Sequence, residues 1–189
     1  MSTHSIEVQS GERFRFGDNW RSFLSTLDDE RIEFATDSLK QWLDTTSLEG
    51  KSFLDIGSGS GLFSLAARKL GASVTSFDFD PASVACTTEL RSRYFPDDPH
   101  WTVLQGSVLD DAFVTSLARA DITYSWGVLH HTGSLWRAIE IAQKTVAPSG
   151  LFFIAIYNDQ GNTSKRWATI KRIYNKSTIG KIVIRLAEA

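Results

Sequence analysis

The sequence predicts an α/β protein built on a doubly wound, mostly parallel sheet. Short apolar runs of strand character alternate with amphipathic stretches of helical period, and a glycine-rich turn follows the first of these runs. Strands that alternate with helices of this length are joined by right-handed crossovers, which give a parallel sheet covered on both faces. A ligand is then expected beyond the carboxyl ends of the strands.

Each expected element has a local signal. Asp80 followed by Pro81 is typical of a helix start, Ser134 is a candidate cap for a later helix, and Gly71 is a candidate helix end. The expected strands are 52–56, 73–77, 101–105, 121–126 and 151–157, with a turn at 148–150 before the last. The expected helices are 28–43, 62–70, 81–94, 112–119 and 135–146.

Composition narrows the protein class. The 189 residues suit one domain with room for an appendage, and the net charge of −2 does not indicate a nucleic-acid partner. Cys86 is the single cysteine, so neither a disulfide framework nor a cysteine metal site is expected. The sequence shows no signal peptide and no apolar run of about 18 residues, so we expect a cytoplasmic protein. We expect no metal.

The turn after the first expected strand reads LDIGSGSG over residues 54–61. Glycines let the backbone approach a ligand closely, although such a turn can also bind nothing. A dinucleotide site would require a glycine where Leu62 stands, and Asp55 would repel a pyrophosphate. The same carboxylate would attract an ammonium group. The turn therefore favours a cationic, non-phosphorylated nucleoside over NAD.

Three motifs in order make a family resemblance. The run LDIGSGSG, a second strand ending in FDFD and a fourth ending in YSWGVLHHT resemble the class I S-adenosylmethionine-dependent methyltransferases, over roughly residues 52–157. Within that class they resemble the ubiquinone- and menaquinone-biosynthesis branch. The resemblance implies a Rossmann-like fold and S-adenosylmethionine as the cofactor.

The resemblance also implies which residues bind the cofactor. Asp55 would face the methionyl ammonium, and Asp78 would accept the ribose hydroxyls. Asp110 would lie near the adenine amine, or would only cap the next helix. Ser107 stands where this branch often has an acidic residue, so the adenine contact departs from the family pattern. The implied cofactor residues are Asp55, Gly57, Ser58, Gly59, Gly61, Asp78, Ser107, Val108, Asp110, Trp126 and Gly127.

Methyl transfer from a sulfonium depends mainly on positioning the acceptor. A base is needed only if the acceptor loses a proton, and His130 and His131 are the candidates, of which at most one should face the acceptor. The alternative is that these histidines only shape the loop. Phe16, Trp20 and Phe23 are expected either to form a lid over cofactor and acceptor or to dock on the sheet. The expected acceptor is small or lipid-like, methylated on oxygen or carbon.

Three parts are expected: an N-terminal lid over 1–50, the cofactor-binding core over 51–160, and a basic extension over 161–189. The extension is either a solvated surface helix or a peripheral contact with an anionic membrane surface. The resembled fold ends in an antiparallel strand pair, yet only 180–186 has strand character beyond 157. We therefore expect a truncated chain, or a partner or second copy at the open sheet edge.

Two other functions stay open at this point. A cofactor-binding but catalytically silent module would fit the incomplete sheet. An NAD-linked oxidoreductase would fit the fold class, although not the glycine spacing.

Overall fold

The computed structural model describes Leu24, residues 26–157 and Gly161, and the structural statements below concern these residues. Tertiary contacts divide the chain into one compact unit that ends at Ile156 and a second that begins at Tyr157. The fold described here belongs to the first unit.

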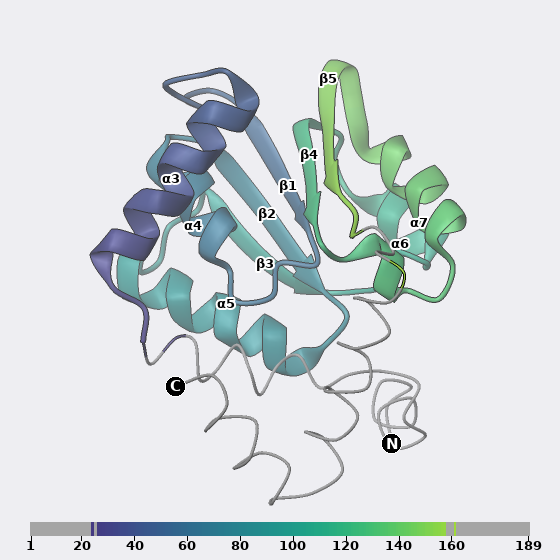
Figure 1. Ribbon diagram of the computed structural model, residues 1–189, viewed down its shortest axis with the longest axis horizontal. Helices are drawn as coiled ribbons and strands as arrows, with labels where there is room; N and C mark the ends of the chain where they lie inside the picture. Colours follow the sequence, from purple (N-terminus) through teal and green to yellow (C-terminus); the bar gives the residue numbers. More distant parts are fainter. Residues whose placement is uncertain (1–23, 25, 158–160, 162–189) are drawn as a thin grey trace, which may run out of the picture. The chain divides into compact units, whose positions relative to one another are not determined.

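Five parallel strands form one sheet in the order β3-β2-β1-β4-β5 (Figure 1). Their bounds are β1 Ser52–Ile56, β2 Ser73–Asp78, β3 Trp101–Gln105, β4 Ala120–Trp126 and β5 Val146–Ala155. The chain moves outward from β1 through β2 to β3, then returns to the other side of β1 for β4 and β5. The strand order therefore reverses beside β1, which is where doubly wound sheets bind ligands.

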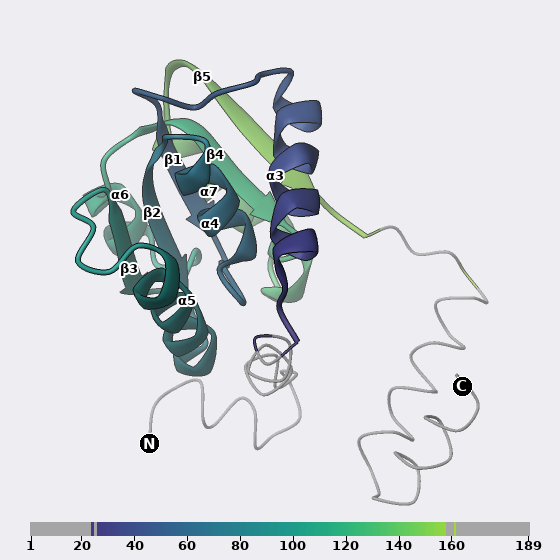
Figure 2. The same cartoon turned by 90° about the vertical axis from the view of Figure 1, so that its left-hand side faces the viewer.

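Helices cover both faces of this sheet. In Figures 1 and 2, α3, α4 and α5 lie on one face, and α6 and α7 lie on the other. Their bounds are α3 Asp29–Leu43, α4 Leu62–Lys69, α5 Pro81–Tyr94, α6 Asp111–Ser116 and α7 Leu135–Ala142, with 3-10 turns η1 Leu129–His131 and η2 Gln143–Thr145. The doubly wound α/β architecture predicted from the sequence is confirmed.

Two apolar cores follow from the alternation of side chains along the strands. Phe53 packs with α3, α4 and α5 residues on one face, whereas its neighbour Leu54 packs with α6 and α7 residues on the other. Successive side chains of a strand point to opposite faces, so a parallel strand that is covered twice must be apolar on both. The exception in β1 is Asp55, a buried carboxylate on the α4 side.

Helix caps occur where the sequence predicts several of them. Asp28 accepts a hydrogen bond from the Arg31 amide and Asp80 accepts one from the Ala82 amide, each at 2.9 Å. Gly71 follows α4 with φ +100°, as a helix end with a glycine requires. Ser134 occupies the N-cap position of α7, as predicted, but its side chain makes no capping hydrogen bond.

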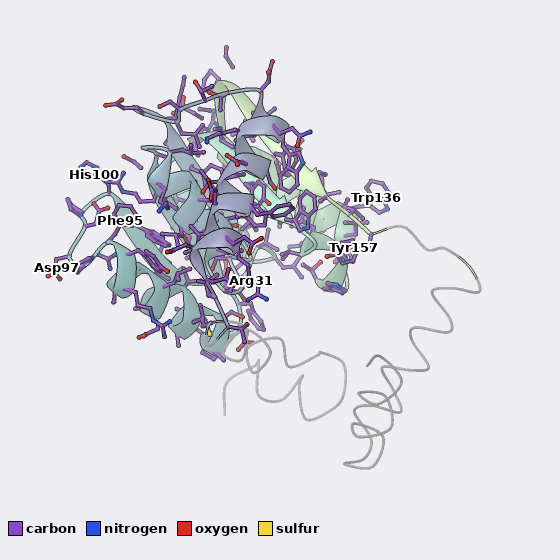
Figure 3. The ribbon with its side chains drawn as sticks, turned by 60° about the vertical axis from the view of Figure 1, so that its left-hand side comes forward. Arg31, Phe95, Asp97, His100, Trp136 and Tyr157 are labelled. Carbon is purple, nitrogen blue, oxygen red and sulfur yellow. The ribbon has the colours of Figure 1, made fainter. Side chains whose placement is uncertain are left out.

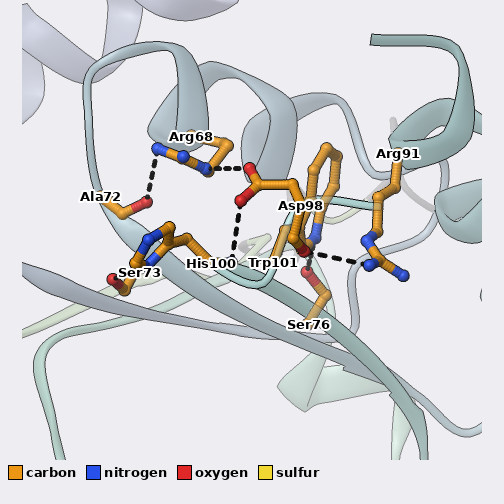
Figure 4. A network of polar contacts seen from close by, with 8 residues as sticks. All are labelled: Arg68, Ala72, Ser73, Ser76, Arg91, Asp98, His100 and Trp101. Carbon is orange, nitrogen blue, oxygen red and sulfur yellow. Dashed lines mark hydrogen bonds and ion pairs between the residues drawn. The ribbon is translucent and has the colours of Figure 1, made fainter. Parts of the chain in front are cut away.

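The connection from α5 to β3 is fixed by an ion pair. Phe95, Asp97 and His100 lie together on this connection (Figure 3). Arg68 of α4 donates from Nε to Asp98 Oδ2 at 2.5 Å (Figure 4), and the guanidinium holds the pKa of Asp98 below its usual value. This pair attaches the loop to α4 and so fixes the start of β3.

Two predicted elements have different bounds in the structure. The helix expected over 112–119 is α6, which ends at Ser116, because Leu117 already has an extended backbone. The helix expected to reach Val146 ends at Ala142, and after η2 Val146 begins β5. The expected turn at 148–150 is an irregularity within β5, where Ser149 has φ +63° and the pairing with β4 shifts register.

The remaining structural predictions lie outside the described residues. These are the lid residues Phe16, Trp20 and Phe23, the basic stretch over 162–189 and any strand over 180–186. The three-part division of the chain and the truncation therefore stay predictions. Among the described helices, none has both the length and the apolar character needed to cross a membrane.

Candidate functional site

The carboxyl ends of the strands are joined by backbone hydrogen bonds. The Gly57 amide, just after β1, donates to the Phe77 carbonyl of β2 at 2.8 Å, and the Gly106 amide, after β3, donates to the Asp78 carbonyl at 3.0 Å. The Gly127 amide, after β4, donates to the Ala155 carbonyl of β5 at 2.9 Å. The glycines and Asp78 that the sequence predicts for the cofactor site therefore lie along one edge of the sheet.

The amides of the glycine loop are used within the protein. Ser58 donates to the Phe77 carbonyl at 3.1 Å, Gly59 donates to Asp78 Oδ2 at 3.0 Å, and Gly61 donates to the Ser58 carbonyl at 2.8 Å. Together with Gly57, four of the five amides from 57 to 61 have internal acceptors. A loop that holds a pyrophosphate must present such amides to the ligand. This arrangement weighs against a dinucleotide site.

Close packing explains why glycines stand at both ends of the loop. Gly57 has φ +77°, and a Cβ there would lie 2.4 Å from Val128 Cγ1. Gly61 has φ +82°, and a Cβ there would lie 2.9 Å from the Thr87 Cα. At both positions a side chain is excluded for two reasons: the backbone is left-handed, and a Cβ would clash with a neighbouring residue.

Asp55 is a buried carboxylate at the base of this loop. Its residue is 3% exposed, and Ser64 of α4 donates to Asp55 Oδ2 at 2.5 Å. Burial raises the pKa of Asp55 to about 7; the Ser64 hydrogen bond opposes this shift, and the negative charge of Asp78 adds to it. Asp55 therefore changes charge near neutral pH, and a nearby cation would favour its ionised form.

Asp78 ends β2 and contacts the loop. Its Oδ2 accepts from the Gly59 amide at 3.0 Å and its Oδ1 accepts from the Asp80 amide at 2.9 Å. Burial raises the pKa of Asp78, while these two amide hydrogen bonds act in the opposite direction. The Phe79 amide also donates to Asp78. A carboxylate can accept about four hydrogen bonds, so capacity for a further donor remains.

Thr87 of α5 is a loop contact that the sequence reasoning missed. Its Oγ1 lies 2.9 Å from Ser58 Oγ and donates to the Gly59 carbonyl at 3.3 Å, and its backbone packs on Gly61. The sequence contained a signal that this face of α5 packs closely against its neighbours. The buried positions of α5 follow helical spacing and are Ser83, Cys86, Thr87 and Leu90, of which the first three are small.

The turn after β3 contains the residues predicted to meet adenine. Val108 is buried in the core on the α6 and α7 face, and Ser107 Oγ accepts from the Leu109 amide at 3.2 Å. Asp110 caps α6 by accepting from the Phe113 amide at 3.1 Å. Asp110 thus caps α6, and whether it also lies near an adenine amine stays a prediction.

Trp126 ends β4 within an aromatic cluster. Its ring is stacked on Trp42 of α3 at 4.4 Å between centroids and on Phe153 of β5 at 6.2 Å. Trp126 is 37% exposed, so part of its ring borders solvent beside the strand ends. Trp42 lies in the helix expected over 28–43, and its stack with Trp126 could not be deduced from helical spacing.

The two histidines lie in η1, just beyond β4. Their ring centroids are 4.0 Å apart; His130 is half-buried and His131 is exposed. Burial lowers the pKa of His130. His130 is thus neutral at pH 7, the form in which an imidazole accepts a proton. Whether either histidine faces an acceptor stays a prediction.

This donor set can be matched against cofactor chemistry. Asp55 offers a buried negative charge and Asp78 offers acceptor capacity beside a close-packed glycine loop. An ammonium group and paired hydroxyls suit these groups, and both occur on S-adenosylmethionine. Within the described part of the chain, no cluster of His, Cys, Asp or Glu side chains could hold a metal ion.

Comparison with known proteins gives a family match. A family described as "Methyltransferase domain" matches residues 27–181 of this chain. The match covers the whole described sheet, including the glycine loop and both histidines.

Curated relatives match a smaller part of the chain. A ribosomal protein L11 methyltransferase of Tolumonas auensis is 32% identical over 116 residues, which cover 50% of this chain and 40% of that protein. A ribosomal protein L11 methyltransferase of Pectobacterium atrosepticum is 33% identical over 98 residues, covering 46% of this chain and 33% of that protein. The chain thus spans less than half the length of these relatives.

Solved structures share the fold. A Methanococcus maripaludis protein described as an S-adenosyl-L-methionine-dependent methyltransferase superposes with a TM-score of 0.62 at 19% identity, covering 92% of this chain and 78% of that chain. Magnesium protoporphyrin IX methyltransferase of Synechocystis, solved with bound S-adenosylmethionine, gives a TM-score of 0.51 at 19% identity, covering 59% of this chain and 52% of that chain. At this identity the likeness concerns the fold.

Proposed function

Because this chain belongs to the methyltransferase domain family, we propose that it binds S-adenosylmethionine at the strand ends and transfers its methyl group to an acceptor. One observation carries the proposal beyond the family. Asp55 and Asp78, on neighbouring strands, stand on either side of a glycine loop whose amides are occupied within the protein.

Each side chain then has a role in binding. Asp55 supplies the negative charge for the methionyl ammonium, and Asp78 accepts hydrogen bonds from the ribose hydroxyls. Gly57 and Gly61 keep the loop free of side chains. Bound S-adenosylmethionine would supply a methyl group on a sulfonium, and the protein's contribution is to hold an acceptor in line with it.

We propose a small or lipid-like acceptor with an apolar or planar group. The partly exposed Trp126 supports this class, since its ring is held by Trp42 and Phe153 at the edge of the site. Rigid aromatic side chains supply large apolar contact area to a ligand. The predicted lid residues would add to this surface.

A protein acceptor is the second candidate. The observation in its favour is that two curated relatives are named ribosomal protein L11 methyltransferases. The half-buried His130 would serve either acceptor as a base when a proton must leave.

Label transfer from tritiated S-adenosylmethionine tests the function and separates the acceptors. We expect label in an organic extract of small and apolar metabolites. Label in ribosomal protein instead would replace the first acceptor by the second. Absence of transfer to either pool by a protein that binds the cofactor would favour the catalytically silent module.

If His130 is the base, His130→Gln should lower kcat by about 100-fold or more, because a positioned base contributes about 10²–10⁴. The matched control is His131→Gln, which changes the exposed neighbour in the same turn and should stay within about threefold of the wild-type kcat. Equal kcat values for the two variants would remove His130 from the reaction.

A further inference from the structure

A line of buried polar groups runs through the core beneath the glycine loop. Trp101 of β3 donates from Nε1 to Ser76 Oγ of β2 at 2.9 Å, and Ser76 Oγ lies 2.7 Å from Ser64 Oγ of α4. Ser64 Oγ lies 2.5 Å from Asp55 Oδ2. Figure 4 shows the Trp101 and Ser76 end of this line, beside the Arg68–Asp98 pair. The serines are 0% exposed and Trp101 is 1% exposed.

When Asp55 is ionised, the number of protons fixes the direction of every hydrogen bond in this line. The indole N–H of Trp101 can only donate, so Ser76 Oγ must accept from it. The Ser64 proton goes to the Asp55 carboxylate. Ser76 must therefore donate its own proton to Ser64, and all donors point toward Asp55. Neither serine can turn its proton elsewhere without losing a buried hydrogen bond.

The line contacts one oxygen of Asp55 and leaves the other for a ligand. Oδ2 accepts from Ser64, and within the part of the chain that the structure describes no hydrogen bond reaches Oδ1. A fixed donor at one oxygen fixes the rotation of the carboxylate, and a donor to a carboxylate favours its ionised form.

We propose that Ser64, supported by Ser76 and Trp101, is a positioning residue that holds the Asp55 carboxylate oriented and ready for the cationic end of the cofactor. The inference rests on the proposed function for the identity of that cofactor. Ser64 itself has no role in touching the ligand, because it lies behind Asp55 in the core.

The groups around Asp55 explain why the Ser64 hydrogen bond matters for the ionisation of Asp55. Its neighbours in the sheet are Ser76 on β2 and Tyr124 on β4, and α4 contributes Ser64. The charged group acting on it is the Asp78 carboxylate, which disfavours ionisation, as burial does. The Ser64 hydrogen bond therefore opposes both effects that raise the pKa of Asp55.

The pH dependence of cofactor binding tests the proposal. For wild type and Ser64→Ala, we would measure the dissociation constant of S-adenosylmethionine by calorimetry from pH 6 to pH 9. The cofactor's own amine titrates identically for both proteins, so the ratio of the two constants isolates Asp55. A one-unit rise in its midpoint in Ser64→Ala gives a ratio of about 10 at pH 6 that approaches one by pH 9.

Three further variants separate positioning from folding. Ser64→Thr keeps the hydroxyl and should restore the wild-type pH profile. Ser76→Ala leaves the hydrogen bond from Ser64 to Asp55 in place but removes its support, so we expect a smaller shift of the Asp55 midpoint in the same direction. This variant tests the proposal even if Ser64→Ala fails to fold. Thr145→Val is the matched control, because it removes a buried, hydrogen-bonded hydroxyl that is not part of the line, and it should keep the wild-type profile.

The Asp55 midpoint can also be read without any cofactor, from the carboxyl carbon shift of the ligand-free protein by NMR. A higher midpoint in Ser64→Ala supports the proposal, and an unchanged midpoint with a pH-independent ratio overturns it. If folded wild-type protein binds no S-adenosylmethionine, the proposed function fails. The NMR midpoints then still decide whether Ser64 controls the ionisation of Asp55.

Discussion

At the scale of single residues, two carboxylates dominate the site, and each is held differently. Asp55 is buried and receives its hydrogen bond from a side chain, whereas Asp78 receives backbone amides at both oxygens. Both pKa values are raised by burial, so the ligand-free protein holds these groups at a cost in stability. Carboxylates whose pKa is raised by burial are common in functional sites, where a bound ligand supplies the favourable interaction that the ligand-free protein lacks.

Asp55→Asn should stabilise the ligand-free protein at neutral pH while weakening cofactor binding. The folded-state pKa of about 7 lies above the unfolded value, so the folded protein binds more protons between about pH 4 and pH 7. In that window the wild type loses stability as the pH rises, by up to about 1.4 kcal/mol per pH unit, and Asp55→Asn does not. Urea unfolding at several pH values measures this difference.

The control for that series is Glu33→Gln, which removes a carboxylate from the exposed side of α3. Its stability should follow the wild-type pH curve. A constant difference between Asp55→Asn and wild type across pH 4–8 would show that Asp55 is ionised in the folded protein throughout, contrary to our account.

Asp78→Ala should weaken S-adenosylmethionine binding by about 10- to 100-fold, because hydrogen bonds to a charged group contribute about 1.5–3 kcal/mol. Calorimetric titration measures the change. Asp121→Ala is the matched control: this carboxylate also accepts two hydrogen bonds, both from Ser52, at the start of β1 and so at the opposite end of the sheet. Equal losses in the two variants would assign the Asp78 effect to folding.

At the scale of elements, α5 supports the glycine loop as well as the sheet. It begins at the Asp80 cap just after Asp78, and about two turns further along Thr87 meets Ser58, Gly59 and Gly61. The loop therefore has a shape that is fixed from two sides, by β2 and by α5. A preformed loop loses less conformational entropy when a ligand binds.

Thr87→Val keeps the shape of the side chain but removes its hydrogen bonds to the loop. We expect a loss of about 1–3 kcal/mol in unfolding free energy, since the buried loop groups lose their partner, together with weaker cofactor binding. Thr88→Val, on the exposed side of the same helix, should change stability by less than about 0.5 kcal/mol. Chemical unfolding and calorimetry give both quantities. Wild-type affinity in Thr87→Val would exclude this supporting role.

Elements with a local signal were predicted well from the sequence. β1, β3 and α5 have the predicted bounds, because glycines, prolines and the Asp80 cap delimit them. The region from α7 to β5 was predicted less well. There α7 ends early, and η2 follows it. β5 begins at Val146 because its pairing with β4 shifts register, and such pairing depends on tertiary contacts.

At the scale of the whole molecule, the sheet order brings together residues that are distant in sequence. Asp55, Asp78, Gly106 and Gly127 lie along one edge because β3, β2, β1 and β4 are adjacent and parallel. The motifs were sufficient to predict this edge and the family. The supports behind it, Ser64, Ser76 and Thr87, were not predicted, because a small hydroxyl inside a helix or strand is read as ordinary core without knowledge of its neighbours.

The central claim is that this edge of the sheet is an S-adenosylmethionine site. Titration of the folded protein with S-adenosylmethionine, its demethylated product and NADH, each by calorimetry, tests that claim most directly. The account predicts one site that binds S-adenosylmethionine and the demethylated product in competition, with no measurable binding of NADH. Binding of NADH in preference to both, or no binding of either sulfur nucleoside by the folded chain, would contradict it.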